Sequence, residues 1–363
     1  MNANNISMKQ NILVRHPGDL TVGWAQRVIS RNLPDVIVSG VDIRSVDTGT
    51  TTRVRLEVEH DGSPDLPRQW FVKLPSLAWR ARLVTALPRL LHTEVRFYNE
   101  AARGVPIAMP GVLAAQSAPG RGAILVLADV SESGAMAGQP GDVLSDAQAA
   151  LVVRRLARLH ARFWNKADFM QAYQWLAGPV RRLEDRLGTA LAVPLMRRGL
   201  RCAGQLVPKK LHRLAVRYAT QRARAMRFLS TAPLTLVHHD CHPGNLFWDG
   251  TKPGLLDWQL VRFGEGISDV AYFLATSLAP ETRRNHETRL VATYVRELQD
   301  NGITGIELGD LLQRYRAHLA YPFEAMVVSL AVGGMMKLEN NYELIRRTAA
   351  AVEDLDAFNA LPI

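Results

Sequence analysis

The residues best suited to chemistry lie in one short segment, where the sequence reads VHHDCHPGN and ends at Asn245. An apolar strand leads into Asp240, a Pro-Gly pair turns the chain, and Asn245 opens the next strand. Asp257 follows twelve residues later, at the end of a strand that returns through a D-G turn. Because these two strands can pair as a hairpin, Asn245 and Asp257 can lie side by side with Asp240 on the adjoining loop. Such a corner suits a magnesium nucleotide, with Asn245 and Asp257 as ligands of Mg²⁺ and Asp240 as acceptor of a hydroxyl proton.

Two other interpretations of this segment stay open. Its three histidines and Asp257 are compatible with ordinary positions in a loop, a core and a strand end. A zinc site would use His238, Cys241 and His242. That site is disfavoured, because the Pro-Gly pair prevents a helix from placing both histidines on one face.

A lysine and a glutamate nearer the N-terminus form a second candidate pair. Lys73 sits at the centre of the apolar strand QWFVKL, although only seven of the 44 basic residues are lysines. Glu94 lies on the apolar stripe of a helix, and a carboxylate buried without a partner is costly. We therefore predict an ion pair between them, the arrangement by which protein kinases direct an ammonium toward nucleotide phosphates. A lysine at a strand edge that extends to water is the open alternative.

The turn VDTGTTTR, residues 46–53, is the candidate phosphate-covering loop. Backbone amides and hydroxyls around Gly49 and Thr50 could contact phosphates. A single glycine does not make a Gly-rich loop, so an ordinary turn is the alternative interpretation.

The elements that would position these residues begin with strands. Alternating and apolar patterns predict a hairpin of strands at Thr52–Glu59 and Gln69–Leu74, and a buried strand at Ala123–Leu127. Helical spacing predicts helices at about 20–31 and 89–102.

The second half of the chain is predicted to be mainly helical. A capping box at Ser145 begins a helix that runs to about Trp164. Helical patterns continue through about 165–230 and again from Ser268 onward. Short strands around Asp240 interrupt them.

These patterns predict a bilobal α+β fold. Residues 1–19 read as a polar tail and residues 20–130 as a small β-rich N-terminal lobe with one key helix. Residues 131–363 read as a larger, mainly helical C-terminal lobe with a helical insertion at about 165–230. The boundary is placed in the Gly- and Pro-rich segment 131–141.

The composition is that of a globular protein. The 363 residues are 47% hydrophobic and 21% charged, with a mean hydropathy of −0.05, which argues against disorder. No apolar run reaches the roughly 18 residues of a membrane span, and no secretory signal is recognisable. Two cysteines, Cys202 and Cys241, cannot form a disulfide framework, so we expect a protein of the reducing cytoplasm.

The net charge of +10 comes from one stretch of the chain. Residues 181–227 hold thirteen basic and two acidic residues, a local excess of eleven, whereas the remainder is close to neutral. If these side chains line a pocket, they disfavour a polycationic substrate; a solvated outer helix face is the alternative. Tyr218 is the one aromatic residue in the stretch, which argues against a nucleic-acid platform.

The pattern His238-x-Asp240-x4-Asn245, followed by Asp257, resembles the catalytic and metal-binding loops of the aminoglycoside phosphotransferase and choline kinase group. That group shares the protein-kinase fold. The stretch HDCHPGNLFWDG…LLDWQLVRFGEGISDVAYFL is similar in particular to a bacterial branch related to ecdysteroid-kinase-like proteins. The resemblance extends in order over about residues 42–278.

The resemblance implies roles for the residues already singled out. Asp240 would be the catalytic base, and Asn245 and Asp257 would be the magnesium ligands. Lys73 and Glu94 would form the clamp for the phosphates of ATP.

Four further residues enter through the resemblance alone. The carbonyl of Ala128 and the amide of Val130 would hold the adenine at the hinge. Asp269 would brace the catalytic loop, although a helix N-cap is equally consistent with its position. His160 matches a common position of the group, and a core histidine is the alternative.

We therefore expect an O-phosphotransferase that uses ATP and Mg²⁺ and acts on a hydroxyl of a small molecule. The charge of residues 181–227 favours a neutral or anionic acceptor over a polycationic aminoglycoside. The alternatives are a catalytically silent kinase-like binding module, an aminoglycoside or macrolide kinase, and a binder of nucleic acid or anionic membranes. The absence of a protein-kinase activation segment after Asp257 argues against protein substrates, and the oligomeric state stays open.

Overall fold

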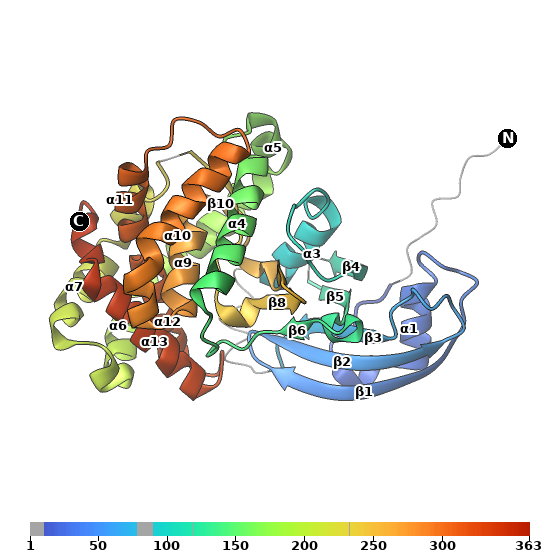
Figure 1. Cartoon of the computed structure of the whole chain (residues 1–363). Coiled ribbons are helices and arrows are strands. Elements are labelled where there is room, and N and C mark those ends of the chain that lie inside the picture. Colours follow the sequence, from blue (N-terminus) through green and yellow to red (C-terminus); the bar gives the residue numbers. More distant parts are fainter. Residues whose placement is uncertain (1–10, 78–89, 119, 232) are drawn as a thin grey trace. The chain divides into compact units, whose positions relative to one another are not determined.

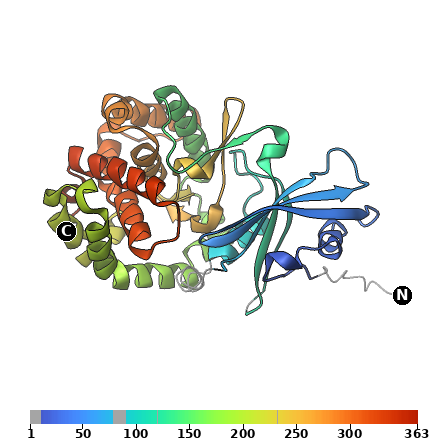
Figure 2. The same cartoon turned by 90° about the horizontal axis from the view of Figure 1, so that it is seen from below.

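The computed structural model describes residues 11–77, 90–118, 120–231 and 233–363. The protein is α+β, with an antiparallel sheet in the N-terminal part and mainly helices in the C-terminal part (Figures 1 and 2).

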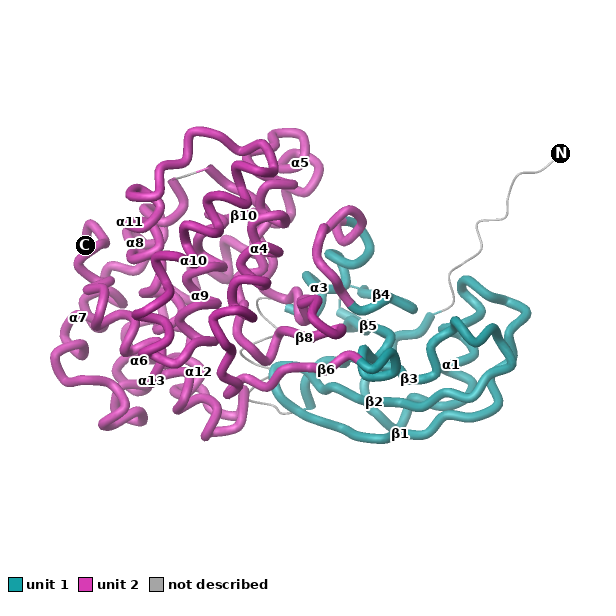
Figure 3. Tube along the Cα trace, in the orientation of Figure 1, with its two compact units in different colours: residues 1–100, 110–134 teal, residues 101–109, 135–363 magenta. Residues whose placement is uncertain are grey.

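The chain divides into two compact units (Figure 3). The first comprises Met1–Glu100 and Pro110–Gly134, and the second comprises Ala101–Met109 and Ala135–Ile363. The division after Gly134 falls within the predicted boundary segment 131–141. The second unit also takes Ala101–Met109, which the sequence placed in the N-terminal lobe.

The first unit is built on a five-stranded antiparallel sheet. In spatial order its strands are β1 (Val38–Thr48), β2 (Thr51–His60), β3 (Gln69–Pro75), β5 (Gly122–Ala128) and β4 (Val112–Ala118). The inner strands β2, β3 and β5 coincide with the three predicted strands. The outer strands β1 and β4 had not been predicted.

Two helices cover opposite faces of this sheet. Helix α1 (Val22–Ile29) packs Trp24 against Trp70 of β3, with ring centroids 6.1 Å apart. Alternate residues of β2 and β3 join the same apolar core. Because successive side chains of a strand point to opposite faces, Lys73 lies on the other face. Helix α3 (Leu90–Glu100) packs there, within the predicted helix 89–102, whose first residue lies outside the described part.

The predicted polar tail is partly wrong. Residues 1–10 lie outside the described part of the chain, but Ile12 is fully buried in the core of the first unit. Its carbonyl accepts the indole N–H of Trp24 at 3.0 Å, and its amide donates to Gln116 at 2.9 Å. Residues 11–19 are therefore part of the folded unit.

The second unit is mainly helical. Its α-helices are α4 (Asp146–Phe163), α5 (Ala167–Ala172), α6 (Pro179–Ala203), α7 (Lys209–Thr220), α8 (Arg222–Phe228), α9 (Ile267–Ser277), α10 (Pro280–Asp300), α11 (Leu308–His318), α12 (Ala320–Val332) and α13 (Leu338–Asp354). The predicted capping box is present: Ser145 and Gln148 satisfy each other's backbone amides at the start of α4.

Short strands interrupt the helices where the sequence predicted them. Strands β8 (Leu246–Asp249) and β9 (Lys252–Leu255) form a hairpin, which β6 (Met136–Ala137) extends. Strands β7 (Thr235–Val237) and β10 (Arg262–Gly264) form a separate antiparallel pair. No helix in the described ranges is both long and apolar enough to span a bilayer.

Candidate active site

Lys73 and Glu94 form a buried ion pair within the first unit. The Lys73 ammonium lies 2.8 Å and 2.9 Å from the two carboxylate oxygens of Glu94. The two residues are only 3% and 0% exposed. The pairing follows from the alternation of β3, which turns Lys73 away from the main core, and from the apolar face of α3, which carries Glu94. A lysine extended to water is therefore excluded, whereas a role toward a nucleotide stays a prediction.

The candidate phosphate-covering loop is a tight turn. Gly49 and Thr50 connect β1 to β2, and the Gly49 amide donates to the Thr51 carbonyl at 2.9 Å. The Ser76 hydroxyl donates to the Gly49 carbonyl at 2.7 Å, so the turn is held to the end of β3. The turn is thus short and anchored, as in an ordinary hairpin.

The hinge residues lie at the end of β5. The Ala128 amide donates to the Gly111 carbonyl at 2.8 Å. The N–H and C=O of one strand residue point to the same side of the strand. The Ala128 carbonyl is therefore directed to the side on which Gly111 lies. Val130 begins a 3-10 turn that Asp129 caps through the Ser131 amide at 3.0 Å. The backbone groups that the resemblance assigned to adenine are thus at the border of β5 and this turn.

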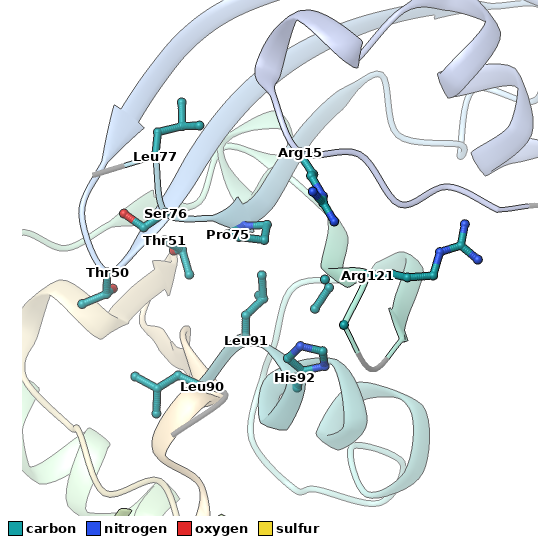
Figure 4. Close-up of a pocket in the computed structure, with 13 residues that line it drawn as sticks. Arg15, Thr50, Thr51, Pro75, Ser76, Leu77, Leu90, Leu91, His92 and Arg121 are labelled. Atoms are coloured by element: carbon teal, nitrogen blue, oxygen red, sulfur yellow. The ribbon is translucent and has the colours of Figure 1, made fainter. Parts of the chain in front are cut away.

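A cavity of about 350 Å³ opens in the first unit (Figure 4). Thr50 and Ser76 line it together with His92 and Arg121. Neither Lys73 nor Glu94 contributes to its lining. Leu77 and Leu90 also line it, and they adjoin residues 78–89, which the structure does not describe. We assign the cavity no ligand.

Asp240 lies in the second unit, on the loop between β7 and the hairpin. Its Oδ1 accepts the hydroxyl of Tyr272 at 2.6 Å, and its Oδ2 accepts the amide N–H of Asn245 at 3.1 Å. The side chain is 25% exposed, so a carboxylate fixed by two donors remains reachable from solvent.

The hairpin brings Asn245 next to the strand end that precedes Asp257. The Leu256 amide donates to the Asn245 carbonyl at 2.8 Å, one residue before Asp257. The Asn245 side-chain nitrogen also donates to the Asp240 carbonyl at 2.9 Å. Because the oxygen and nitrogen of an amide diverge, the Asn245 side-chain oxygen is directed away from Asp240. Asp257 has a left-handed backbone with a φ of 61°, which is uncommon for a residue other than glycine and typical of functional sites.

Asp269 braces the loop from helix α9. Its two carboxylate oxygens accept the backbone amides of His238 and His239 at 2.7 Å and 2.8 Å. The α9 helix has no side-chain cap, so the N-cap interpretation of Asp269 is wrong. His160 is fully buried between Asp269, 3.3 Å away, and the Tyr294 hydroxyl, 2.8 Å away. It is therefore a core histidine that supports the brace.

The histidine and cysteine side chains of the loop do not form a zinc site. His238 bonds the Leu256 carbonyl through Nε2 at 2.7 Å, and His242 accepts the Gly244 amide at 3.1 Å. Cys241 is fully buried, and burial raises the pKa of its thiol well above the usual value. Across the part of the chain that is described, no group of three or more His, Cys, Asp or Glu residues could hold a metal ion.

The basic stretch 181–227 is mostly exposed. Eleven of its thirteen basic side chains face solvent, which corresponds to the outer helix face that was the alternative to a cationic pocket wall. Arg181 and Arg222 are the buried exceptions. Arg222 pairs with Glu324 at 2.6 Å, and Arg181 donates to the carbonyls of Gln259 and Val261, both at 2.8 Å. The charge argument against a polycationic acceptor therefore loses its basis.

Sequence reasoning missed three contributors to this site. Tyr272 was quoted only as part of a motif, yet it bonds Asp240. His239 has a φ of 71° and stacks on Tyr321 with ring centroids 4.2 Å apart. Arg181 was counted only as a charge. His239 is the middle residue of the His-x-Asp motif, and that position could have indicated its unusual backbone. No local signal marks Tyr272 or Arg181.

Comparison with known proteins identifies a family and a fold. The model of the ecdysteroid kinase-like family matches residues 51–303. No curated protein matches the chain.

Solved structures of low sequence identity are similar to this chain. Choline kinase from Cryptosporidium parvum Iowa II has a TM-score of 0.51 at 11% identity, covering 94% of this chain and 97% of that chain. The GDP complex of aminoglycoside 2'-phosphotransferase-IIIa has a TM-score of 0.51 at 13% identity, covering 93% and 99%. Plasmodium vivax ethanolamine kinase has a TM-score of 0.49 at 12% identity, covering 92% and 89%. The first two similarities show a kinase-like fold.

Proposed function

Because the chain belongs to the ecdysteroid kinase-like family, we propose that it transfers the γ-phosphate of ATP to a hydroxyl of a small molecule, with Mg²⁺ as cofactor. One observation carries the proposal: the hairpin of the second unit gathers Asp240, Asn245 and the end of the strand before Asp257. Structures of a choline kinase and an aminoglycoside phosphotransferase with the same fold support it.

Asp240 is the proton acceptor in this proposal. Its carboxylate is partly exposed and held by Tyr272 and Asn245, which use one lone pair on each oxygen. Each oxygen of a carboxylate has two lone pairs, so an acceptor hydroxyl can still donate to it. As the hydroxyl oxygen bonds to phosphorus, its proton passes to Asp240 and the phosphate leaves ADP.

Asn245 and Asp257 are the residues that would hold Mg²⁺. Magnesium takes few protein oxygens and completes its octahedron with water and phosphate oxygens. The Asn245 amide fits this role, because its nitrogen is committed to Asp240 and its oxygen is directed elsewhere. The ion would neutralise negative charge on the phosphates when bound.

Lys73 would bind the nucleotide phosphates from the first unit. The bidentate contact with Glu94 holds the ammonium in one position, so little side-chain entropy is lost on binding. The turn at Gly49 and Thr50 and the hinge groups of Ala128 and Val130 are proposed to contact the phosphates and the adenine.

The acceptor is a small hydroxylated molecule of either charge. The exposed basic helices no longer argue for a neutral or anionic one. Near Tyr321, charged groups of both signs are present, including Arg262, Arg222, Asp240 and Glu184. An acceptor panel must therefore include neutral, anionic and cationic compounds.

The test is an ADP-release assay of the full chain with MgATP over hydroxylated metabolites, aminoglycosides and macrolides. We expect at least one acceptor to accelerate ADP release and to gain a phosphate detectable by mass spectrometry. Asp240→Asn should lower transfer by about 100-fold or more while MgATP still binds. Asp249→Asn is the matched control, because Asp249 is an exposed aspartate on the same hairpin.

Two results would contradict the proposal in different ways. Wild-type transfer by Asp240→Asn would exclude Asp240 as the proton acceptor. Saturable MgATP binding with no transfer to any compound or to water would identify a silent kinase-like binding module.

A further inference from the structure

Beyond the proposed function, on which this inference rests, we propose that Tyr272 is a positioning residue that orients the carboxylate of Asp240. Tyr272 lies on α9, and its hydroxyl donates to Oδ1 of Asp240 at 2.6 Å. The tyrosine is 2% exposed, whereas the Asp240 side chain is 25% exposed. A buried donor thus approaches the protected side of a carboxylate that is open on the other side.

The orientation of the Asp240 carboxylate is fixed by donors from two elements. Tyr272 on α9 holds Oδ1, and Asn245 at the start of the hairpin holds Oδ2 at 3.1 Å. Two hydrogen bonds to different oxygens define both the position and the plane of the group. Loss of the phenol would leave the carboxylate free to rotate about the bond to its β-carbon, and misplacement of a catalytic group slows transfer.

Tyr272 acts as a hydrogen-bond donor and not as a proton acceptor. Burial, followed by the negative charge of Asp240, raises the pKa of the Tyr272 phenol well above its usual value. The phenol therefore keeps its proton throughout the working pH range.

Other buried tyrosines of the second unit show why this contact differs from ordinary core packing. Tyr315 donates to Glu287 at 2.9 Å, and Tyr218 donates to Glu324 at 2.8 Å. Those two carboxylates are also paired with arginines.

Asp240 has a different set of partners. Among the described residues, no lysine or arginine pairs with it, and the His242 imidazole is 3.9 Å away. Neutral donors, the Tyr272 phenol and the Asn245 amide, therefore fix the orientation of the Asp240 carboxylate without an arginine.

The experiment compares Tyr272→Phe with Tyr315→Phe in the full chain. Each variant removes one buried phenol oxygen that donates to a carboxylate, so the two should lose similar stability in urea unfolding. MgATP hydrolysis, with water as acceptor, is followed by ADP release. We expect Tyr272→Phe to lower kcat by about tenfold with little change in KM for ATP. Tyr315→Phe should leave both values close to those of the wild type.

A second measurement does not depend on turnover. Crystal structures of the wild type, Tyr272→Phe and Tyr315→Phe compare the plane of the Asp240 carboxylate. The carboxylate should rotate in Tyr272→Phe and stay in place in Tyr315→Phe. If it rotates while neither the wild type nor any variant releases ADP, the proposed function fails but the role of Tyr272 stands. An unchanged Asp240 carboxylate in Tyr272→Phe would overturn that role, whatever the enzyme does.

Discussion

The carboxylate of Asp269 holds the backbone at His239. Its Oδ1 accepts the His239 amide at 2.8 Å, and its Oδ2 accepts the adjacent His238 amide at 2.7 Å. Asp269 is fully buried and reaches the loop from another element, helix α9. The backbone that presents Asp240 is therefore fixed from outside the loop, including the left-handed residue immediately before it.

Asp269→Asn tests this brace. The substitution keeps the shape but places an NH₂ group against an amide donor, so one buried amide loses its acceptor. We expect the free energy of unfolding to fall by about 1–3 kcal/mol, and kcat to fall more than the KM for ATP rises. Urea unfolding and initial rates measure the two effects, with Asp249→Asn as control. Wild-type kcat in a destabilised Asp269→Asn protein would show that the brace does not serve catalysis.

The Lys73–Glu94 pair allows stability to be separated from nucleotide binding. Lys73→Met leaves the buried Glu94 carboxylate without the Lys73 ammonium, and we expect a loss of about 3–5 kcal/mol in the free energy of unfolding. Adding Glu94→Gln removes both charges and should restore most of that stability. MgATP binding, measured by calorimetry, should stay weak in both variants, because neither has the cation.

The control for this pair is Arg96→Ala, which removes an exposed cation from the same helix and should change neither quantity. A double variant that binds MgATP like the wild type would contradict the clamp. A double variant no more stable than Lys73→Met would show that the negative charge of Glu94 is not what destabilises Lys73→Met.

The sequence predicted the inner strands of the sheet better than its edges. Strands β2, β3 and β5 have neighbours on both sides, and their alternating or continuous apolar residues follow from that burial. Strands β1 and β4 are edges, and their side chains are mostly exposed in β1 and mostly half-buried in β4. A half-exposed edge needs no alternation, so its residues carry little pattern to detect.

The same distinction holds at the candidate site. Asp240, Asn245 and Asp257 flank one hairpin in the sequence, so their spacing alone predicted that they lie close together. Tyr272 contacts Asp240 from 32 residues away, and Arg181 contacts Gln259 from 78 residues away. Such contacts depend on how helices pack on the hairpin, and no local pattern records them.

Arg181 links the basic stretch to the segment after the proposed magnesium ligand Asp257. It is buried and donates to the carbonyls of Gln259 and Val261, which follow Asp257 closely along the chain. Arg181→Met would leave these carbonyls without the guanidinium and loosen the segment. We expect the Mg²⁺ concentration for half-maximal activity to rise by about tenfold, as for other residues that support a metal ligand.

Arg182→Met is the matched control, because Arg182 is exposed and adjacent in the same helix. A magnesium titration of MgATP hydrolysis at fixed nucleotide compares the two variants. Equal titrations for both would show that Arg181 contributes charge and packing only.

His239 makes the stability of the second unit depend on pH. Burial lowers the pKa of its imidazole well below the usual value, and nearby positive charges add to the effect. Those charged groups are Arg262, Arg181, His318 and Arg222. The folded protein therefore keeps His239 neutral at a pH where the unfolded chain already binds a proton there.

The sign of the effect follows from this difference in bound protons. Below the unfolded pKa of about 6.5, unfolding takes up a proton at His239, so the free energy of unfolding falls as the pH falls. The slope reaches at most about 1.4 kcal/mol per pH unit for one proton, and it levels off below the lowered folded pKa. Urea unfolding at several pH values between 5 and 8 measures it.

Two variants separate the titration of His239 from its packing. His239→Asn removes the titratable group and keeps a residue that tolerates the left-handed φ of 71°. Its acid slope should decrease by about one proton. Tyr321→Leu removes the stacked ring and keeps the imidazole, so it should lower stability while retaining an acid slope. If His239→Asn kept the full slope, the acid sensitivity would arise elsewhere, and the neutral imidazole beside Asp240 would not be its cause.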